Sequence, residues 1–278
     1  MSLSINTNIA AIDAYNNLNN TSNALDKTIS QLSSGLQIQT AADNSSGYVI
    51  AQDLQVQSNG LNVAISNGQN AVSVLQIANG AMNQQVNILQ RMNELAVQAS
   101  NSGALSSNAS SAVNTEFQDL ATQLNQIALS TTFGSGTNSL LSTQQVLTFQ
   151  LGAYTSGNDQ VAVTLQATTA ASLGILTTNL SLSNFASAQA ALASVQSAID
   201  QVSSIQASVG ASQNQIQADI SNLTISQQNV QAAHSSLVDA NMAQTMTTFT
   251  AQQILMQAGT AMLGQAQQLP SMILKLIP

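Results

Sequence analysis

A seven-residue repeat of apolar side chains in the C-terminal third of the chain restricts the possible folds more than any other feature. One row of the repeat consists of Ala188, Val195, Val202, Val209, Ile216, Leu223, Val230 and Leu237. A second row, four positions later, consists of Leu192, Ile199, Gln206, Gln213, Ile220, Gln227 and His234. A heptad pattern of this length requires a partner helix. Its Gln residues are either polar register markers or weak points in the packing.

Three further segments show helical periodicity. The first carries one apolar stripe, with steps of three, four and seven residues: Ile5, Ile9, Ile12, Tyr15, Leu18, Leu25, Ile29, Leu32 and Leu36. Gly35 ends or bends this helix, and the small polar residues 40–47 indicate a linker. The second follows a repeat close to 3.5 residues: Leu61, Ile65, Gly68, Val72, Leu75, Met82, Val86, Leu89 and Ala96. A shorter helix carries Val113, Phe117, Leu120, Leu124 and Ile127 on one face.

The middle of the chain has a different period. Leu147, Phe149 and Leu151 alternate with polar residues, as do Val161, Val163 and Leu165. Two alternating segments around the Gly-containing stretch 152–158 predict a β-hairpin, and Gly134 to Gly136 predict a loop. The expected fold is therefore mainly α, with long coiled-coil-like helices folded back as a rod and a small β-hairpin in mid-chain. Helices are expected at about 45–100, 105–130 and 185–236, a hairpin region at about 132–183, and a last helix from Met242 to Leu276.

The composition excludes several classes of function. Only 5% of the 278 residues are charged, and 3 Lys and Arg stand against 11 Asp and Glu, for a net charge of −8. Nucleic-acid binding and attachment to an acidic membrane surface need clusters of cations that are absent here. The chain has 0 Cys, which rules out disulfides and thiolate metal ligands. Gln and Pro residues interrupt the apolar stretch 254–277, so no membrane span is expected.

No constellation of residues indicates catalysis. His234 lies on the heptad row without a catalytic partner at a known spacing, so we expect a packed or half-buried helix residue. Glu116 and Asp119 are close on one helix, yet nothing around them suggests a cleft for acid–base chemistry. The scattered Asp residues are expected to solvate helix faces. We therefore expect no enzyme activity, no catalytic residue, no cofactor and no metal site.

Several motifs resemble those of bacterial flagellins. They include residues 5–8 (Ile-Asn-Thr-Asn), 32–36 (Leu-Ser-Ser-Gly-Leu), 87–98, 131–133 and 252–266. The similarity runs nearly from end to end of the chain. Because the sequence leaves no room for the outer variable domains of larger flagellins, it resembles a minimal form of the family.

The resemblance implies a structural subunit that polymerises into the extracellular bacterial flagellar filament for swimming motility. Residues 1–42 and 237–278 are then expected to pair as the filament core, and residues 43–236 to form the rod domain. The expected partners are further copies of the chain, a flagellar export chaperone, and the cap and hook-junction proteins. Export is expected to occur without a cleaved signal peptide. The alternatives are a hook–filament junction protein of the same family and a non-filament coiled-coil surface adaptor.

The resemblance also assigns candidate residues. Gln90, Arg91, Leu95 and Glu116 match family positions that contact neighbouring subunits and that the vertebrate flagellin-sensing receptor recognises. The subunit contact is the preferred role, and Arg91 is also expected to pair with Glu94 one turn on. The residues expected to pack in the terminal coiled coil are Ile5, Ile9, Ile12, Leu18, Leu25, Ile29, Leu32, Met242, Phe249, Leu255, Met262, Leu269 and Ile273.

The chain departs from the family pattern by lacking basic residues. Gln37 follows Leu36 where the family usually has Arg, and Ala42 stands where Lys is common. In strong acid carboxylates become neutral, and a chain rich in Lys and Arg would then repel its own copies. This chain would carry few positive charges under such conditions. We therefore hypothesise that it works in an acidic medium, with a sugar coat on Ser and Thr, or sequence drift, as competing explanations.

Overall fold

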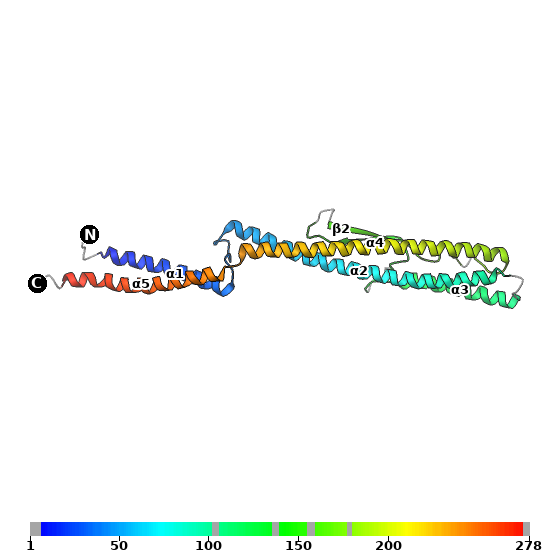
Figure 1. The fold of residues 1–278 in the computed structure, drawn as a ribbon, viewed down its shortest axis with the longest axis horizontal. Coiled ribbons are helices and arrows are strands. Elements are labelled where there is room, and N and C mark those ends of the chain that lie inside the picture. Colours follow the sequence, from blue (N-terminus) through cyan, green and yellow to red (C-terminus); the bar gives the residue numbers. More distant parts are fainter. Residues whose placement is uncertain (1–6, 102–105, 135–138, 155–158, 177–179, 275–278) are drawn as a thin grey trace. The chain divides into compact units, whose positions relative to one another are not determined.

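The chain folds into five helices and one β-hairpin within the residues that the structure describes (Figure 1). The computed structural model describes residues 7–101, 106–134, 139–154, 159–176 and 180–274, without the side chains of 269–274. The chain divides into two compact units, of which the second is Gln57–Gln228 and the first combines Met1–Val56 with Asn229–Pro278. The predicted domain limits at 42 and 237 both fall within the first unit.

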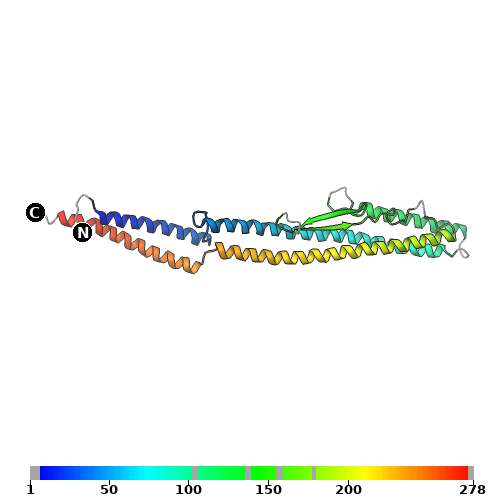
Figure 2. The same ribbon diagram turned by 90° about the horizontal axis from the view of Figure 1, so that it is seen from above.

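The first unit is built on an antiparallel pair of helices. α1 (Ile9–Ser34) begins at Asn8, whose side chain accepts a hydrogen bond from the Ala11 N–H, and α1 ends at Gly35. Gly35 has a φ of 73°, a conformation that glycine adopts without steric cost. α5 (Met242–Leu274) lies beside α1, as both views show (Figures 1 and 2). The first turns of α2 (Ser45–Ala99) and the last turns of α4 (Phe185–Val238) complete this unit.

The second unit packs α3 (Ser107–Ser130) and long stretches of α2 and α4 around one apolar core. Six members of the predicted row of α2, at seven-residue intervals, are buried: Leu61, Gly68, Leu75, Met82, Leu89 and Ala96. The other three, Ile65, Val72 and Val86, are partly buried against the same core. On α3 the predicted residues Val113, Phe117 and Leu124 are buried as well. The interior also holds the Gln85 side-chain amide, which donates to the backbone carbonyls of Leu124 at 3.3 Å and Thr168 at 3.0 Å.

Most residues of the first predicted heptad row of α4 are buried, whereas most residues of the second predicted row are not. Ala188, Val195, Val202, Val209 and Ile216 are buried, as the first row predicts. Between residues 188 and 209 the other fully packed positions are Ala191, Ala198 and Ile205, which follow the first row by three residues rather than four. Of the second predicted row, Leu192 and Ile199 are only partly buried, whereas Ile220 is buried. The buried face of α4 is therefore centred between the first predicted row and the row that contains Ala191 and Ala198. Because these Ala side chains are small, a pattern of large apolar residues does not reveal that they are buried.

The predicted hairpin is also present. β1 (Gln145–Gln150) and β2 (Gln160–Leu165) pair antiparallel, with Leu147 opposite Val163 and Phe149 opposite Val161. These residues face the core, whereas Val146 on the other face is 59% exposed. Part of the predicted turn, residues 155–158, and part of the predicted loop at 134–136 lie outside the described residues.

Candidate assembly surface

The contact between α1 and α5 follows a heptad pattern on both helices. On α1 the buried or half-buried residues that form it are Ala11, Ala14, Leu18, Thr21, Leu25, Thr28 and Leu32. On α5 they are Thr245, Phe249, Gln252, Met256, Gly259, Leu263 and Ala266. The alternating steps of three and four residues are those of a coiled coil. We call this contact the α1–α5 seam.

Two hydrogen bonds and one close approach set the register of the seam. The Thr28 hydroxyl donates to Gln252 Oε1 at 2.6 Å, and the Asn8 amide donates to the Ala266 carbonyl at 2.7 Å. Between them Gly259 faces Leu18, and a Cβ at Gly259 would stand 3.2 Å from Leu18 Cδ1. The early part of α1 therefore contacts the late part of α5, which makes the pair antiparallel.

The seam includes four of the residues predicted for terminal packing, namely Leu18, Leu25, Leu32 and Phe249. Others lie outside it with large exposed fractions: Ile9 62%, Ile12 49%, Ile29 46%, Met242 47%, Leu255 58% and Met262 65%. The interpretation of residues 5–36 as a single stripe is therefore wrong, because α1 carries apolar residues on two faces and α5 covers only one. Ile5 lies outside the described residues, and so do the side chains of Leu269 and Ile273.

The outward faces of α1 and α5 are consequently apolar. Besides the residues above, Tyr15 is 54% exposed, Met246 50% and Ile254 61%. Large exposed apolar surfaces on a protein mark sites of interaction with another molecule. Whether the outward residues pack in a filament core stays a prediction.

The turn between α1 and α2 is fixed to the turn between α4 and α5. The Gln37 N–H donates to the Val238 carbonyl at 2.7 Å, and the Ala240 N–H donates to the Gly35 carbonyl at 2.8 Å. Asp43 closes the first turn, since its carboxylate accepts from the N–H groups of Gln39 and Thr40 and lies 2.7 Å from Lys27 Nζ. Lys27 and these N–H donors hold the pKa of Asp43 well below its usual range. Sequence reasoning assigned Asp43 only a solvating role and missed this cluster.

A second cluster joins α2 to α3. Arg91 Nη2 and Nε donate to Glu116 Oε1 at 2.8 and 3.0 Å, and Arg91 Nη1 donates to Glu94 Oε2 at 2.9 Å. The predicted pair of Arg91 with Glu94 is therefore present. Glu116 and Glu94 together raise the pKa of the Arg91 guanidinium. Glu116 is thus held by Arg91 rather than paired with Asp119.

The four predicted contact residues do not share one surface. Gln90, Arg91 and Glu116 are exposed, whereas Leu95 is 1% exposed within the core. Leu95 thus packs beneath the surface that carries Arg91, and its contact with a neighbouring subunit or a receptor stays a prediction.

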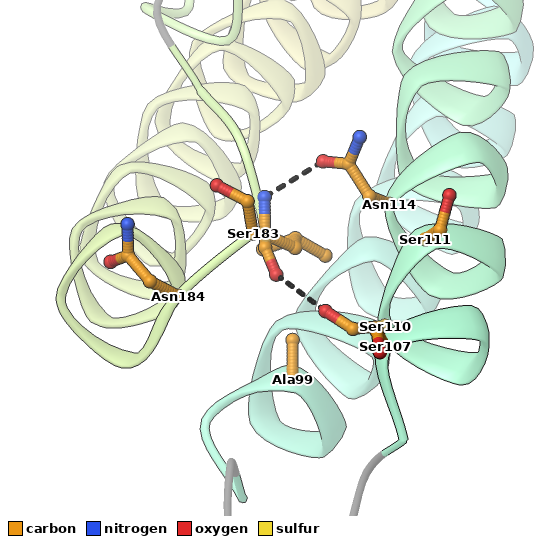
Figure 3. Close-up of a pocket in the computed structure, with 8 residues that line it drawn as sticks. Ala99, Ser107, Ser110, Ser111, Asn114, Ser183 and Asn184 are labelled. Atoms are coloured by element: carbon orange, nitrogen blue, oxygen red, sulfur yellow. Dashed lines mark hydrogen bonds between the residues drawn. The ribbon is translucent and has the colours of Figure 1, made fainter.

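A hollow of about 470 Å³ lies where the end of α2 meets the starts of α3 and α4 (Figure 3). The Asn114 side chain accepts from the Leu182 N–H at 2.8 Å, and the Ser110 hydroxyl donates to the Leu182 carbonyl at 3.4 Å. Ser, Asn, Ala and Leu side chains line it, and none of them titrates near neutral pH. The described lining of the hollow therefore includes no general base that could activate one of its Ser hydroxyls as a nucleophile.

The described residues also hold no group of three His, Cys, Asp or Glu side chains that could bind a metal ion. His234 is half-buried on α4, at a heptad position. In the described part of the chain, none of the helices has both the length and the hydropathy that a membrane span needs.

Comparisons with known proteins match nearly the whole chain. Residues 5–145 match the model of the bacterial flagellin N-terminal helical region, and residues 192–277 match that of the C-terminal helical region. A flagellin of Halalkalibacterium halodurans is 34% identical, with 98% of this chain and 99% of that protein covered. A flagellin of Bacillus subtilis is 35% identical with the same coverage. The flagellar filament 33 kDa core protein of Treponema phagedenis is 31% identical, again with 98% and 99% covered.

Proposed function

Because this chain belongs to the bacterial flagellin family and is a structural subunit of the flagellar filament, we propose that the outward faces of α1 and α5 make the contacts between copies in the filament core. The observation that carries the proposal is the exposure of Ile9, Ile254 and Met262, each above 60%, on two helices that already cover each other's inner faces. Burial of apolar surface is the main favourable term in protein association. In a polymer of a single chain, the neighbouring molecules that could cover these faces are other copies of the same chain.

The proposal extends to how the subunit reaches the filament. We propose that it is exported without a cleaved signal peptide and is received by an export chaperone, a filament cap and a hook-junction protein. Exposed apolar faces on α1 and α5 would give a chaperone its binding surface before assembly. The flagellin and filament names of the relatives favour the filament subunit over the junction protein and the surface adaptor.

Substitutions on the outward face of α5 test the proposal. Leu255→Gln with Met262→Gln removes two apolar side chains that lie outside the α1–α5 seam, so the folded subunit should keep its helicity. Polymerisation of the purified chain, followed by sedimentation and electron microscopy, should be lost. A matched control, Gln244→Ala with Gln265→Ala, changes two exposed polar residues of the same helix and should still polymerise.

A truncation tests the same proposal more severely. The chain without residues 238–278 lacks all of α5 and should remain helical and soluble through its second unit while forming no filaments. Filaments from either this truncated chain or the α5 double variant would show that the outward face of α5 makes no essential contact.

A further inference from the structure

Methionine is the side chain of this protein that peroxides oxidise most readily. The chain has 8 Met and 0 Cys, so thioethers are its only sulfur groups, and it has 0 Trp. Oxidation of a thioether gives a sulfoxide, which turns a flexible apolar side chain into a polar one. An oxidant dissolved in water reaches exposed sulfur atoms first, so the exposure of each Met decides the order in which they react.

Exposed and buried Met side chains occupy different parts of the structure. Met82 and Met92 are 0% exposed in the core of the second unit. Met242, Met246 and Met262, all on α5, are 47%, 50% and 65% exposed. In the part of the chain whose side chains the structure describes, every exposed Met therefore lies on α5.

The three exposed Met side chains belong to the proposed assembly surface. They lie outside the α1–α5 seam, on the same helix as exposed Ile254 and Leu255. In the monomer, water can bond to a sulfoxide oxygen at these positions, so the folded unit does not need to change. Against a second copy of the chain, the same oxygen would lose that water. Because burial of a polar group without a new hydrogen-bond partner is unfavourable, oxidation should oppose polymerisation.

We infer that Met242, Met246 and Met262 form a modification site for hydrogen peroxide, at which oxidation keeps the folded subunit out of the filament. The inference rests on the proposed function of the outward face of α5. In the reaction, a lone pair of the thioether sulfur attacks one peroxide oxygen, so that an S–O bond forms and the O–O bond breaks. The other oxygen takes up a proton and leaves as water. The sulfur loses two electrons and the peroxide gains them, so the reaction needs no metal ion and no further reactant.

Treatment of the purified monomer with hydrogen peroxide tests the inference. Peptide mass spectrometry should find sulfoxide at the three exposed positions of α5 before it appears at Met82 or Met92. Circular dichroism should show unchanged helicity once the peroxide has been removed. The critical concentration for polymerisation should rise about tenfold or more, which corresponds to about 1.4 kcal/mol per subunit. An oxidised chain that polymerises as readily as the untreated chain would overturn the inference.

Leucine substitutions show whether these three sulfur atoms cause the effect. Leu has nearly the volume of Met and contains no sulfur. For the variant with Met242→Leu, Met246→Leu and Met262→Leu, the critical concentration after peroxide should stay within about twofold of its own value before peroxide. The matched control, Met256→Leu, changes a half-buried Met of the seam and should lose polymerisation after peroxide as the unsubstituted chain does. Equal losses in the two variants would assign the effect to other residues and overturn the inference.

Partial oxidation tests the same point without any substitution. The chain is oxidised at a fraction of its Met residues, polymerised and sedimented, and sulfoxide is mapped in the filaments and in the supernatant. Sulfoxide at Met242, Met246 and Met262 should be depleted about tenfold in the filaments. Equal sulfoxide content at these positions in both fractions would overturn this inference and leave the proposed function intact. Failure of the untreated chain to polymerise, or filaments from the variant with Leu255→Gln and Met262→Gln, would instead overturn the proposed function.

Discussion

Gly68 offers a sharp test of how closely α2 and α4 pack in the second unit. A Cβ at Gly68 would stand 2.7 Å from Ile220 Cγ1 and 3.2 Å from Leu151 Cδ2. Real Cβ atoms do not approach so closely, so Gly68→Ala forces Ile220 and its neighbours to move. Ile220 is 8% exposed and its branched Cβ restricts the direction in which it can turn. Overpacking of this kind costs about 1–3 kcal/mol in the free energy of unfolding.

Gly80, in the same helix, provides the matched control. A Cβ there meets nothing within 4 Å. Replacing a helical Gly by Ala stabilises a helix by about 1 kcal/mol at either position, because Ala loses less conformational freedom on folding. Gly80→Ala should therefore raise the free energy of unfolding by about 1 kcal/mol. Gly68→Ala should lower it, by up to about 2 kcal/mol once the same gain is subtracted from the packing cost.

Urea unfolding of the monomer, followed by circular dichroism at 222 nm, measures both changes. The difference between the two variants should be about 1–3 kcal/mol, with similar dependence on urea concentration. If Gly68→Ala stabilises the chain as much as Gly80→Ala does, α2 and α4 do not pack as closely at this level as the structure shows, and the assignment of Gly68 to the buried row is wrong.

Three further predictions concern charge. Arg91→Ala should weaken polymerisation, measured by sedimentation, while the helicity of the monomer stays unchanged; unaltered polymerisation would remove Arg91 from the subunit contacts. Asp43→Asn should lower the free energy of unfolding at neutral pH, and the difference from the unsubstituted chain should shrink as the pH falls below about 4. The pKa of Asp43 is lower in the folded state than in the unfolded state. The stabilisation by the ionised carboxylate is therefore complete above the unfolded-state pKa and is lost as the pH falls towards the folded-state pKa. Denaturation midpoints at several pH values check this, and a gap that stays constant down to pH 2 would contradict it. Filaments of this chain should keep their length in electron micrographs at an acidic pH that shortens a flagellin of ordinary charge content; equal shortening would refute the acid-adaptation hypothesis.

The ion pairs of the described residues bear on that last hypothesis. Lys27 and Arg91 each contact a carboxylate, and Asp43 stays ionised in more acid solution than an ordinary Asp does. The turn that precedes α2 therefore keeps its ion pair through mild acidification.

The sequence predicted the second unit well because burial on one face of a long helix leaves a periodic trace. Leu75, Met82 and Leu89 are large, and their seven-residue spacing is visible without any structure. The hairpin was predictable for the same reason, since Leu147 and Phe149 alternate with polar residues. Ala191 and Ala198 were missed because small side chains pack as tightly as large ones and carry little hydrophobic signal.

The terminal helices were harder to interpret. Both α1 and α5 have two apolar faces, and a pattern cannot say which face the other helix covers. Ile9 and Ile12 are larger and more apolar than Ala11 and Ala14, yet the Ala residues form the seam. Small residues allow two helix backbones to approach, as Gly259 does opposite Leu18. The larger residues remain on the outer surface.

Among the candidate site residues, ion pairs between residues close in sequence could be predicted, and ion pairs between residues far apart in sequence could not. Arg91 and Glu94 are one turn apart on one helix, so their ion pair followed from sequence. Glu116 reaches Arg91 only because α3 lies beside α2, and Asp43 reaches Lys27 only through the turn at Gly35. The resemblance placed Leu95 with the contact residues, although its side chain points into the core.

The antiparallel pairing of α1 with α5 also affects the timing of folding. Asn8 bonds to a carbonyl 258 positions later in the chain, and Thr28 bonds to a side chain 224 positions later. At a synthesis rate of about 5–20 residues per second, α1 spends roughly 10–50 s on the ribosome before its partner has been made. During that interval Leu18 and Leu25 have no helix to pack against, and a lone helix of this length is marginal in water. The first unit therefore cannot fold during translation in the order in which its residues emerge, and α1 reaches the end of synthesis without its partner helix.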